Sequence, residues 1–251
     1  MATDKLQHSK LSVDIRQFDY AGWPKMAAAL VQGWMDSILQ RQGRCSVMLT
    51  GGRSAERLYG VWSELPEFQL LKGVRFYFGD ERCVPADHPE SNYGMVMRSL
   101  FQWGVPAGCS VFPMDGADPD RDAAARRYDE ALPEKMDVLL LGVGEDGHIA
   151  SLFPGSEALR ETGRRVVPVV GPKLPHERLT ITPPVINRAG SIFVLAAGAA
   201  KAAVLSDLLA APDNDVLKLP ARLALHATWL LDTALPEITL TGSQELPCPR
   251  Y

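Results

Sequence analysis

Short apolar runs alternate with amphipathic stretches along most of this chain. Residues 138–141 form a continuous apolar run, which is typical of a strand buried on both faces of a parallel sheet. Similar runs predict strands at residues 45–50, 74–79, 109–114, 165–170, 179–182, 191–197 and 228–231. Because helical patterns separate several of these runs, the order predicts an α/β fold with a single doubly wound, mostly parallel sheet and helices on both faces. We expect one domain over residues 1–251, with its core at about 20–235.

The clearest predicted helix spans residues 24–42. Pro24 suits its first turn and Gly43 its end. Its apolar positions recur at helical spacing and predict one buried face, formed by Met26, Leu30, Val31, Trp34, Met35, Ile38 and Leu39. Further helices are expected at residues 55–59, 93–101, 118–132 and 198–209, of which 118–132 carries a charged, solvated face. The tail at residues 236–251 is punctuated by prolines and is expected to be frayed.

The composition narrows the class of protein. Apolar residues make up 46% of the chain and charged residues 22%, which is ordinary for a globular enzyme, and the net charge of −4 argues against a nucleic-acid surface. The four cysteines include no C-x-x-C pair, so we expect reduced thiols and neither disulfides nor a zinc site. The first ten residues lack the apolar core of a secretory signal, and no apolar stretch is long enough to span a bilayer. We therefore expect a cytoplasmic monomer without membrane or nucleic-acid partners.

A glycine-rich loop follows the apolar run at residues 138–141. Gly142, Gly144 and Gly147 fit the dinucleotide-binding pattern G-x-G-x-x-G. That pattern requires a helix of normal length after its third glycine, whereas Pro154 leaves room for barely two turns. It also requires an acid at the end of the next strand, and residues 165–170 contain none. We therefore expect no nucleotide cofactor at this loop.

The same loop contains the best candidate for proton transfer, His148. An imidazole titrates near neutral pH, at about 6.5, so it can take up and release a proton under working conditions. Asp146 is placed to orient or polarise the ring of His148. No two histidines have metal-ligand spacing on one element, so no metal is expected. The chain also lacks the G-x-S-x-G motif of α/β serine hydrolases.

Charged groups follow several of the other predicted strands. In open α/β sheets, ligands bind at the carboxyl ends of the strands, so we expect these groups to meet in one crevice. The turn at residues 51–54 predicts either an anion cradle built from backbone N–H groups or a tight corner with Ser54 as N-cap. Asp80 and Arg82 end a second strand. The cations suited to a phosphate are Arg53, Arg82, Lys173, Arg178 and Lys201.

Several motifs, taken in order, resemble those of one enzyme family. They are Thr50-Gly-Gly-Arg-Ser54, Phe78-Gly-Asp-Glu-Arg82, Leu141-Gly-Val-Gly-Glu-Asp-Gly-His148, Pro172-Lys173 with Arg178-Leu-Thr180, and Gly198 with Lys201-Ala-Ala. The chain resembles the 6-phosphogluconolactonases of the glucosamine-6-phosphate isomerase superfamily. The resemblance implies hydrolysis of 6-phospho-D-glucono-1,5-lactone in the oxidative pentose phosphate pathway, without a cofactor.

The resemblance also implies roles for individual residues. The catalytic group comprises His148, Asp146 and Arg82. Substrate binding is assigned to Gly51, Gly52, Arg53, Ser54, Asp80, Lys173, Arg178 and Lys201. Two positions depart from the family pattern: Arg53 stands where many members have serine, and Ile149 stands where threonine is common.

Two alternatives to the lactonase stay open. One is a glucosamine-6-phosphate deaminase, although deaminases carry a catalytic aspartate in the loop of the second motif, which here reads Asp80-Glu-Arg-Cys-Val-Pro85. The other is a sugar-phosphate sensor without catalysis, against which an intact His148 and the lack of a DNA-reading segment argue.

Overall fold

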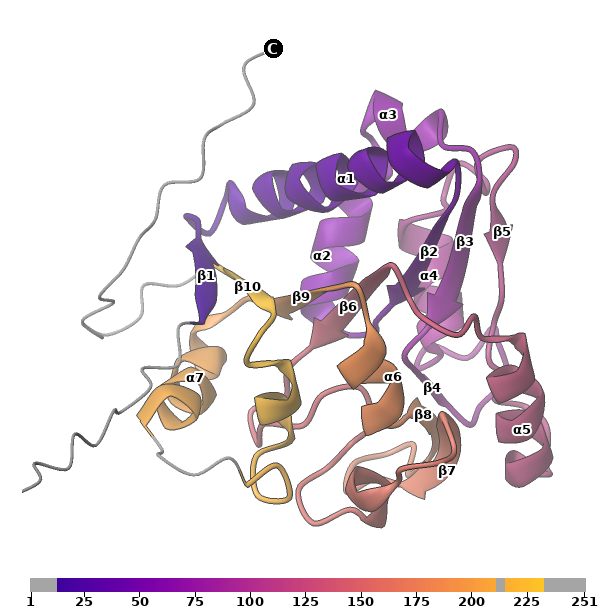
Figure 1. Cartoon of the computed structure of the whole chain (residues 1–251), viewed down its shortest axis with the longest axis vertical. Coiled ribbons are helices and arrows are strands. Elements are labelled where there is room, and N and C mark those ends of the chain that lie inside the picture. The colour runs from indigo at the N-terminus through magenta and orange to yellow at the C-terminus, as the bar shows by residue number, and fades with distance from the viewer. Residues whose placement is uncertain (1–12, 211–214, 233–251) are drawn as a thin grey trace, which may run out of the picture.

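The main sheet of the computed structural model has seven strands, all parallel to their neighbours (Figure 1). The structure describes residues 13–210 and 215–232, and every structural statement here concerns these residues. In spatial order the strands are β1 (Asp14–Gln17), β10 (Thr228–Leu231), β9 (Ser191–Ala196), β6 (Val138–Gly142), β2 (Cys45–Leu49), β3 (Val74–Phe78) and β5 (Ser110–Val111). β6 lies between β9 and β2, so its apolar run is buried on both faces, as predicted.

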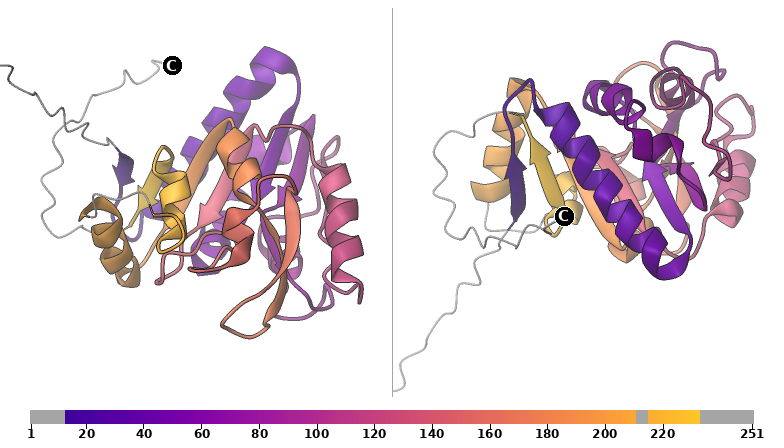
Figure 2. Two further views of the ribbon diagram at one scale, coloured as in Figure 1. Left: turned by 60° about the horizontal axis from the view of Figure 1, so that its bottom comes forward. Right: turned by 90° about the horizontal axis from the view of Figure 1, so that it is seen from above.

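Helices cover both faces of this sheet, which confirms the predicted doubly wound α/β class (Figures 1 and 2). Helices α1 (Trp23–Gln42), α2 (Arg53–Trp62) and α4 (Asn92–Ser99) pack side by side on one face. Helices α6 (Pro183–Arg188) and α7 (Ala202–Ala210) lie on the other (Figure 1). The remaining helical segments are α3 (Pro66–Gln69), α5 (Arg121–Ala131) and the 3₁₀ turns η1 (Glu157–Arg160), η2 (Ala199–Lys201) and η3 (Pro220–Ala224).

A second, antiparallel sheet accompanies the main one. It contains β4 (Asp80–Arg82), β8 (Glu177–Ile181) and β7 (Val166–Val170), in that order. Gly79 joins the two sheets: its N–H donates to Leu49 of the main sheet, and its carbonyl accepts from Ile181 of β8, both at 2.9 Å. The hairpin of β7 and β8 projects from the body of the protein (Figure 2). The chain therefore places residues 80–82 directly beside the carboxyl ends of the parallel strands.

Helix α1 begins and ends where the sequence predicts, but its buried face differs in part. Gly43 adopts a left-handed conformation, with φ of 71°, and its N–H caps the helix on the carbonyl of Leu39. Met26 and Trp34, expected in the core, are 50% and 49% exposed. Trp34 instead rests edge-on against Phe193 and donates its indole N–H to a serine hydroxyl. The buried face of the helix instead consists of Trp23, Ala27, Ala28, Val31, Gln32, Met35 and Ile38.

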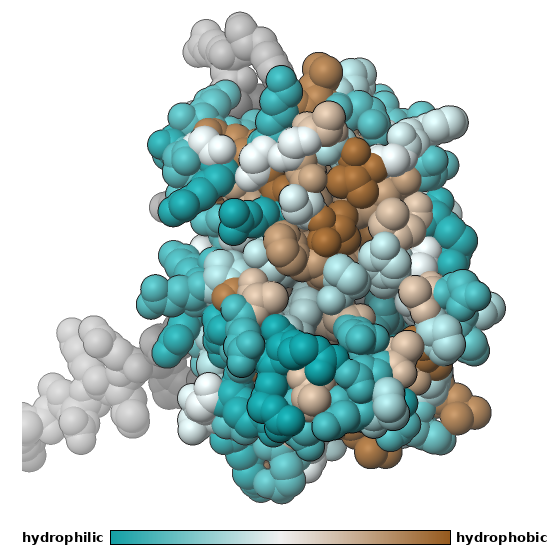
Figure 3. Space-filling model, turned by 90° about the vertical axis from the view of Figure 1, so that its right-hand side faces the viewer, coloured by the Kyte–Doolittle hydropathy of each residue, from teal (hydrophilic) through white to brown (hydrophobic). Residues whose placement is uncertain are grey.

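Other predictions for the elements have mixed outcomes. The strand β1 was not predicted, because its four residues, Asp-Ile-Arg-Gln, contain a single apolar position and so show no clear alternation. The helix expected at 118–132 is present as α5. Figure 3 shows the side of the protein that carries α5, and hydrophilic side chains gather over its lower half. The tail at residues 236–251 and the first ten residues lie outside the described part of the chain. No helix in residues 13–210 or 215–232 is long and apolar enough to cross a membrane.

Candidate active site

A cavity of about 510 Å³ opens at the carboxyl ends of β2, β6 and β9. Loops from both sheets form its walls, as the rule for open α/β sheets requires. Ten of the eleven predicted site residues line it: Gly51, Gly52, Arg53, Ser54, Asp80, Arg82, His148, Lys173, Arg178 and Lys201. Asp146, the eleventh, does not line the cavity but contacts His148 directly. The structure thus brings together residues that lie up to 150 positions apart in the sequence.

His148 is held in place by a tight turn after β6. The N–H of Gly144 donates to the carbonyl of His148 at 2.8 Å, and Gly147 completes the turn with φ of 79°. Nδ1 of His148 lies 2.5 Å from Oδ1 of Asp146. This hydrogen bond is the main reason that the pKa of Asp146 falls to about 2. Because Asp146 stays ionised, Nδ1 carries the proton of a neutral imidazole, and Nε2 is left as an acceptor.

Packing around the His148 ring restricts it further. The ring of Phe153 lies 4.8 Å from it, centre to centre. Gly144 lies so close that a Cβ there would stand 2.0 Å from Nδ1. Ala150 has φ of 49°, a left-handed conformation that is uncommon for a residue with a side chain. The turn therefore fixes both the tautomer and the direction of the histidine.

The glycine turn before α2 forms a second wall of the cavity. Gly52 is the N-cap, with φ of 94° and no side chain to cap the helix, so the first N–H groups of α2 are available to an anion. Ser54 lies within the helix, and its hydroxyl contacts the main chain of Ala197 at 3.4 Å. The alternative of Ser54 as N-cap is therefore wrong. Arg53 and Lys201 line the same part of the cavity, and burial lowers the pKa of Lys201.

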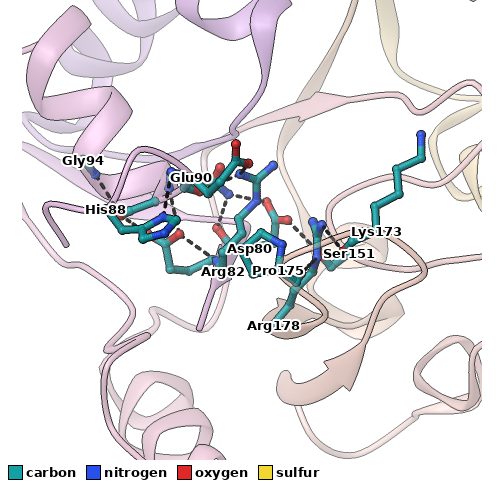
Figure 4. Close-up of polar contacts among 12 residues, drawn as sticks. Asp80, Arg82, His88, Glu90, Gly94, Ser151, Lys173, Pro175 and Arg178 are labelled. Atoms are coloured by element: carbon teal, nitrogen blue, oxygen red, sulfur yellow. Dashed lines mark hydrogen bonds and ion pairs between the residues drawn. The ribbon is translucent and has the colours of Figure 1, made fainter. Parts of the chain in front are cut away.

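Two arginines face each other across the small sheet. Arg82 of β4 and Arg178 of β8 are register partners. Like charges directly opposite each other destabilise a sheet, so an anion bound beside the two guanidinium groups would offset their repulsion. Arg82 donates to the carbonyl of Glu90 at 2.6 Å, and Arg178 donates to the carbonyls of Lys173 and Pro175 (Figure 4). Arg178 thereby also shapes the loop from which Lys173 reaches the cavity.

The acidic residues of β4 are buried and bonded within the protein. Asp80 accepts hydrogen bonds from the Ser151 hydroxyl at 2.6 Å and the Asn92 amide at 3.1 Å (Figure 4). Glu81 accepts from the N–H groups of Asn92 and Tyr93, each at 2.7 Å, and burial raises its pKa. Asp80 thus lines the cavity with both carboxylate oxygens already occupied. Its contacts fit the positioning of the wall better than direct contact with a ligand.

Several cavity residues were assigned no role from the sequence. Tyr20, Arg57, Asn92 and residues 197–200 also line the cavity. Arg57 looked like an ordinary charged position on a helix, and only the packing of α2 against the ends of β9 and β10 brings it to the site. Within the described residues, no three His, Cys, Asp or Glu side chains lie close enough together to hold a metal ion.

Together, the fold and the cavity define a class: an α/β protein whose cavity, at the carboxyl ends of the parallel strands, is lined by several cations and by one histidine that is hydrogen-bonded to a carboxylate. Comparison with known families makes this more specific. The chain belongs to the family of glucosamine-6-phosphate isomerases and 6-phosphogluconolactonases, whose model matches residues 22–231.

Individual relatives agree with the family and confirm the resemblance predicted from the motifs. The 6-phosphogluconolactonase of Rattus norvegicus is 40% identical over 211 residues, which are 77% of this chain and 80% of that protein. The 6-phosphogluconolactonase of Synechocystis is 36% identical over 77% of this chain and 84% of its own length. A solved structure of 6-phosphogluconolactonase from Trypanosoma cruzi matches with a TM-score of 0.77 at 28% identity, covering 90% of this chain and 96% of that one.

Proposed function

We propose that this protein hydrolyses 6-phospho-D-glucono-1,5-lactone to 6-phosphogluconate, the second step of the oxidative pentose phosphate pathway. The observation that carries the proposal is the hydrogen bond between Nδ1 of His148 and Asp146 at a cavity lined by cations, which in a neutral imidazole directs Nε2 to act as the proton acceptor. A lactone is an activated ester, so one well-placed base is sufficient and no covalent nucleophile is needed. The names of the relatives support the same reaction.

The reaction begins when Nε2 of His148 takes a proton from water, and the water oxygen attacks the lactone carbonyl carbon. Asp146 stabilises the imidazolium that forms, because its carboxylate remains ionised beside Nδ1. Arg82 or backbone N–H groups of the cavity wall hold the oxyanion. His148 then returns the proton to the ring oxygen as the C–O bond breaks, which gives the open-chain carboxylic acid.

The cations hold the phosphate and fix the reacting carbonyl against the base. The turn at residues 51–54 supplies N–H groups, and Lys173, Arg178 and Lys201 supply charge. Lys201 lines the cavity together with Arg53 and Lys173, and burial, with a contribution from these two charges, lowers the pKa of Lys201. An anion placed among these side chains offsets their mutual repulsion. Binding energy from the phosphate is thereby used to position the lactone.

The test is turnover of freshly generated 6-phosphogluconolactone by the wild type and by His148→Ala. We expect the wild type to exceed the spontaneous reaction and the variant to lose about 10² to 10⁴-fold in kcat, the range for removal of a general base. Calorimetry should show that His148→Ala still binds 6-phosphogluconate, because the phosphate contacts remain. A wild type no faster than the spontaneous reaction would refute the proposal, and ammonia released from glucosamine 6-phosphate would point to a deaminase instead.

A further inference from the structure

An ion pair apart from the histidine site contributes to the same cavity. Arg57 of α2 lines the cavity, and its Nη1 lies 2.8 Å from Oδ2 of Asp232, which follows β10. Its Nη2 donates to the carbonyl of Tyr20 at 2.9 Å, and its guanidinium lies 4.2 Å from the centre of the Tyr20 ring. The Asp232 side chain is only 1% exposed. A carboxylate so deeply buried is stable only when its charge is compensated, and Arg57 provides one such partner.

The other oxygen of this carboxylate holds the turn that carries Lys201. Oδ1 of Asp232 accepts the N–H of Gly198 at 2.6 Å. Gly198 has φ of 102°, and its carbonyl accepts the N–H of Lys201 at 3.0 Å, so one short turn joins the two residues. Lys201 is partly buried at the cavity, where burial lowers its pKa and the nearby charge of Glu145 opposes that effect. A short hydrogen bond to a charged acceptor is stronger than one between neutral groups, so Asp232 restrains the position of this turn.

We propose that Asp232, oriented by Arg57, is a positioning residue that sets the location of Lys201 at the phosphate-binding wall. The inference rests on the proposed function, since it assigns Lys201 to the phosphate of the ligand. Neither Asp232 nor Arg57 touches the reacting atoms. Their effect reaches the ligand through the Gly198–Lys201 turn, so it concerns affinity for the phosphate and leaves the proton transfer at His148 alone.

A double-mutant cycle tests this route. Calorimetry measures the affinity for 6-phosphogluconate in the wild type, Asp232→Ala, Lys201→Met and the double variant. Loss of a charged phosphate contact at Lys201 should weaken binding by about tenfold. Asp232→Ala should weaken it by several fold, and the double variant should bind no more weakly than Lys201→Met, because both changes remove the same interaction. Asp232→Asn should recover part of the affinity, since its amide oxygen can still accept the N–H of Gly198.

Two further variants separate positioning from general loss of structure. Asp129→Ala is the matched control, because Asp129 of α5 also bonds an arginine, with Oδ1 2.6 Å from Nε of Arg165, but lies away from the cavity. It should lower thermal stability without changing affinity in either background. If Asp232→Ala does not fold, Arg57→Met takes its place in the cycle, because the Arg57 side chain is 30% exposed and its loss removes the ion pair that orients the Asp232 carboxylate toward Gly198.

The outcomes are distinguishable. If the loss of affinity in the double variant equals the sum of the losses in its two single variants, the positioning role is wrong, but the lactonase proposal still stands. A wild type that does not bind 6-phosphogluconate at all would overturn both. For Asp232→Ala, we expect a raised KM with kcat within about twofold of the wild type, since the base His148 is unaffected.

Discussion

A single methyl group at Gly144 should disable the base without disturbing the phosphate site. A Cβ at this position would lie 2.0 Å from Nδ1 of His148 and 2.4 Å from Oδ1 of Asp146. Non-bonded heavy atoms rest at about 3.5 to 4.0 Å, so the imidazole or the turn must move by about 1.5 Å to admit it. A displacement of about 1 Å at a reacting centre is enough to lower a rate 10²-fold. We therefore expect Gly144→Ala to lose about 100-fold in kcat.

Gly142 offers a matched control two residues earlier on the chain. A Cβ there would lie 3.6 Å from the carbonyl oxygen of Gly51 and 3.7 Å from Oγ1 of Thr50, both ordinary contacts. Steady-state turnover of the lactone should place Gly142→Ala within about threefold of the wild type, a difference under 1 kcal/mol. Both variants should keep their affinity for 6-phosphogluconate. Full activity in a folded Gly144→Ala would refute the reasoning that this turn holds the histidine against Asp146.

Two more predictions follow from the hydrogen bonds of the site. The hydrogen bond to His148 lowers the pKa of Asp146 from 3.8, the ordinary value of an aspartate, to about 2. Its contribution to folding stability is therefore present above pH 3.8 and is lost only as the pH falls through 2. Asp146 stays ionised above pH 4, so the acid limb of a kcat/KM profile measured there should have a slope no greater than one. A steeper limb would show that a second group must also lose its proton. Ser151→Ala removes the 2.6 Å hydrogen bond to the buried Asp80 carboxylate and should lower the free energy of unfolding by about 1.5 to 3 kcal/mol, seen as a lower urea midpoint with an unchanged slope. An unchanged midpoint would mean that water replaces the lost hydroxyl at Asp80.

The sequence predicts an element well when the apolar pattern of that element matches its burial in the folded protein. The strands β6 and β9 lie inside the main sheet, and burial on both faces gives each a continuous apolar run that is visible without the structure. The runs of β2 and β3 are interrupted only by Ser46 and Arg75. The glycine turn and the loop carrying His148 could be assigned to one site because the carboxyl ends of parallel strands meet at one edge of the sheet.

What the sequence could not predict depends on pairing between distant segments. The small sheet unites residues 80–82 with residues 166–181. The three charged residues 80–82 by themselves do not indicate an antiparallel partner so far along the chain. The burial of Glu81 could not be predicted for the same reason. Glu81 is only 2% exposed, and the N–H groups that bond its carboxylate belong to the start of α4, eleven and twelve residues later in the sequence. Arg57 is held at the cavity in part by Asp232, which lies 175 positions away in the sequence.

The pairing of Arg82 with Arg178 restricts how this part of the protein can change during evolution. Their spacing is set by main-chain hydrogen bonds of an antiparallel ladder, in which Glu81 faces Leu179 and Asp80 faces Thr180. Inserting or deleting one residue in either strand would turn one guanidinium to the opposite side of the sheet. The two strands therefore tolerate substitutions but not changes in length. The hairpin tip at residues 171–176 shares this restriction, because the carbonyls of Lys173 and Pro175 accept hydrogen bonds from Arg178, and a change in its length would move Lys173 relative to the arginine pair.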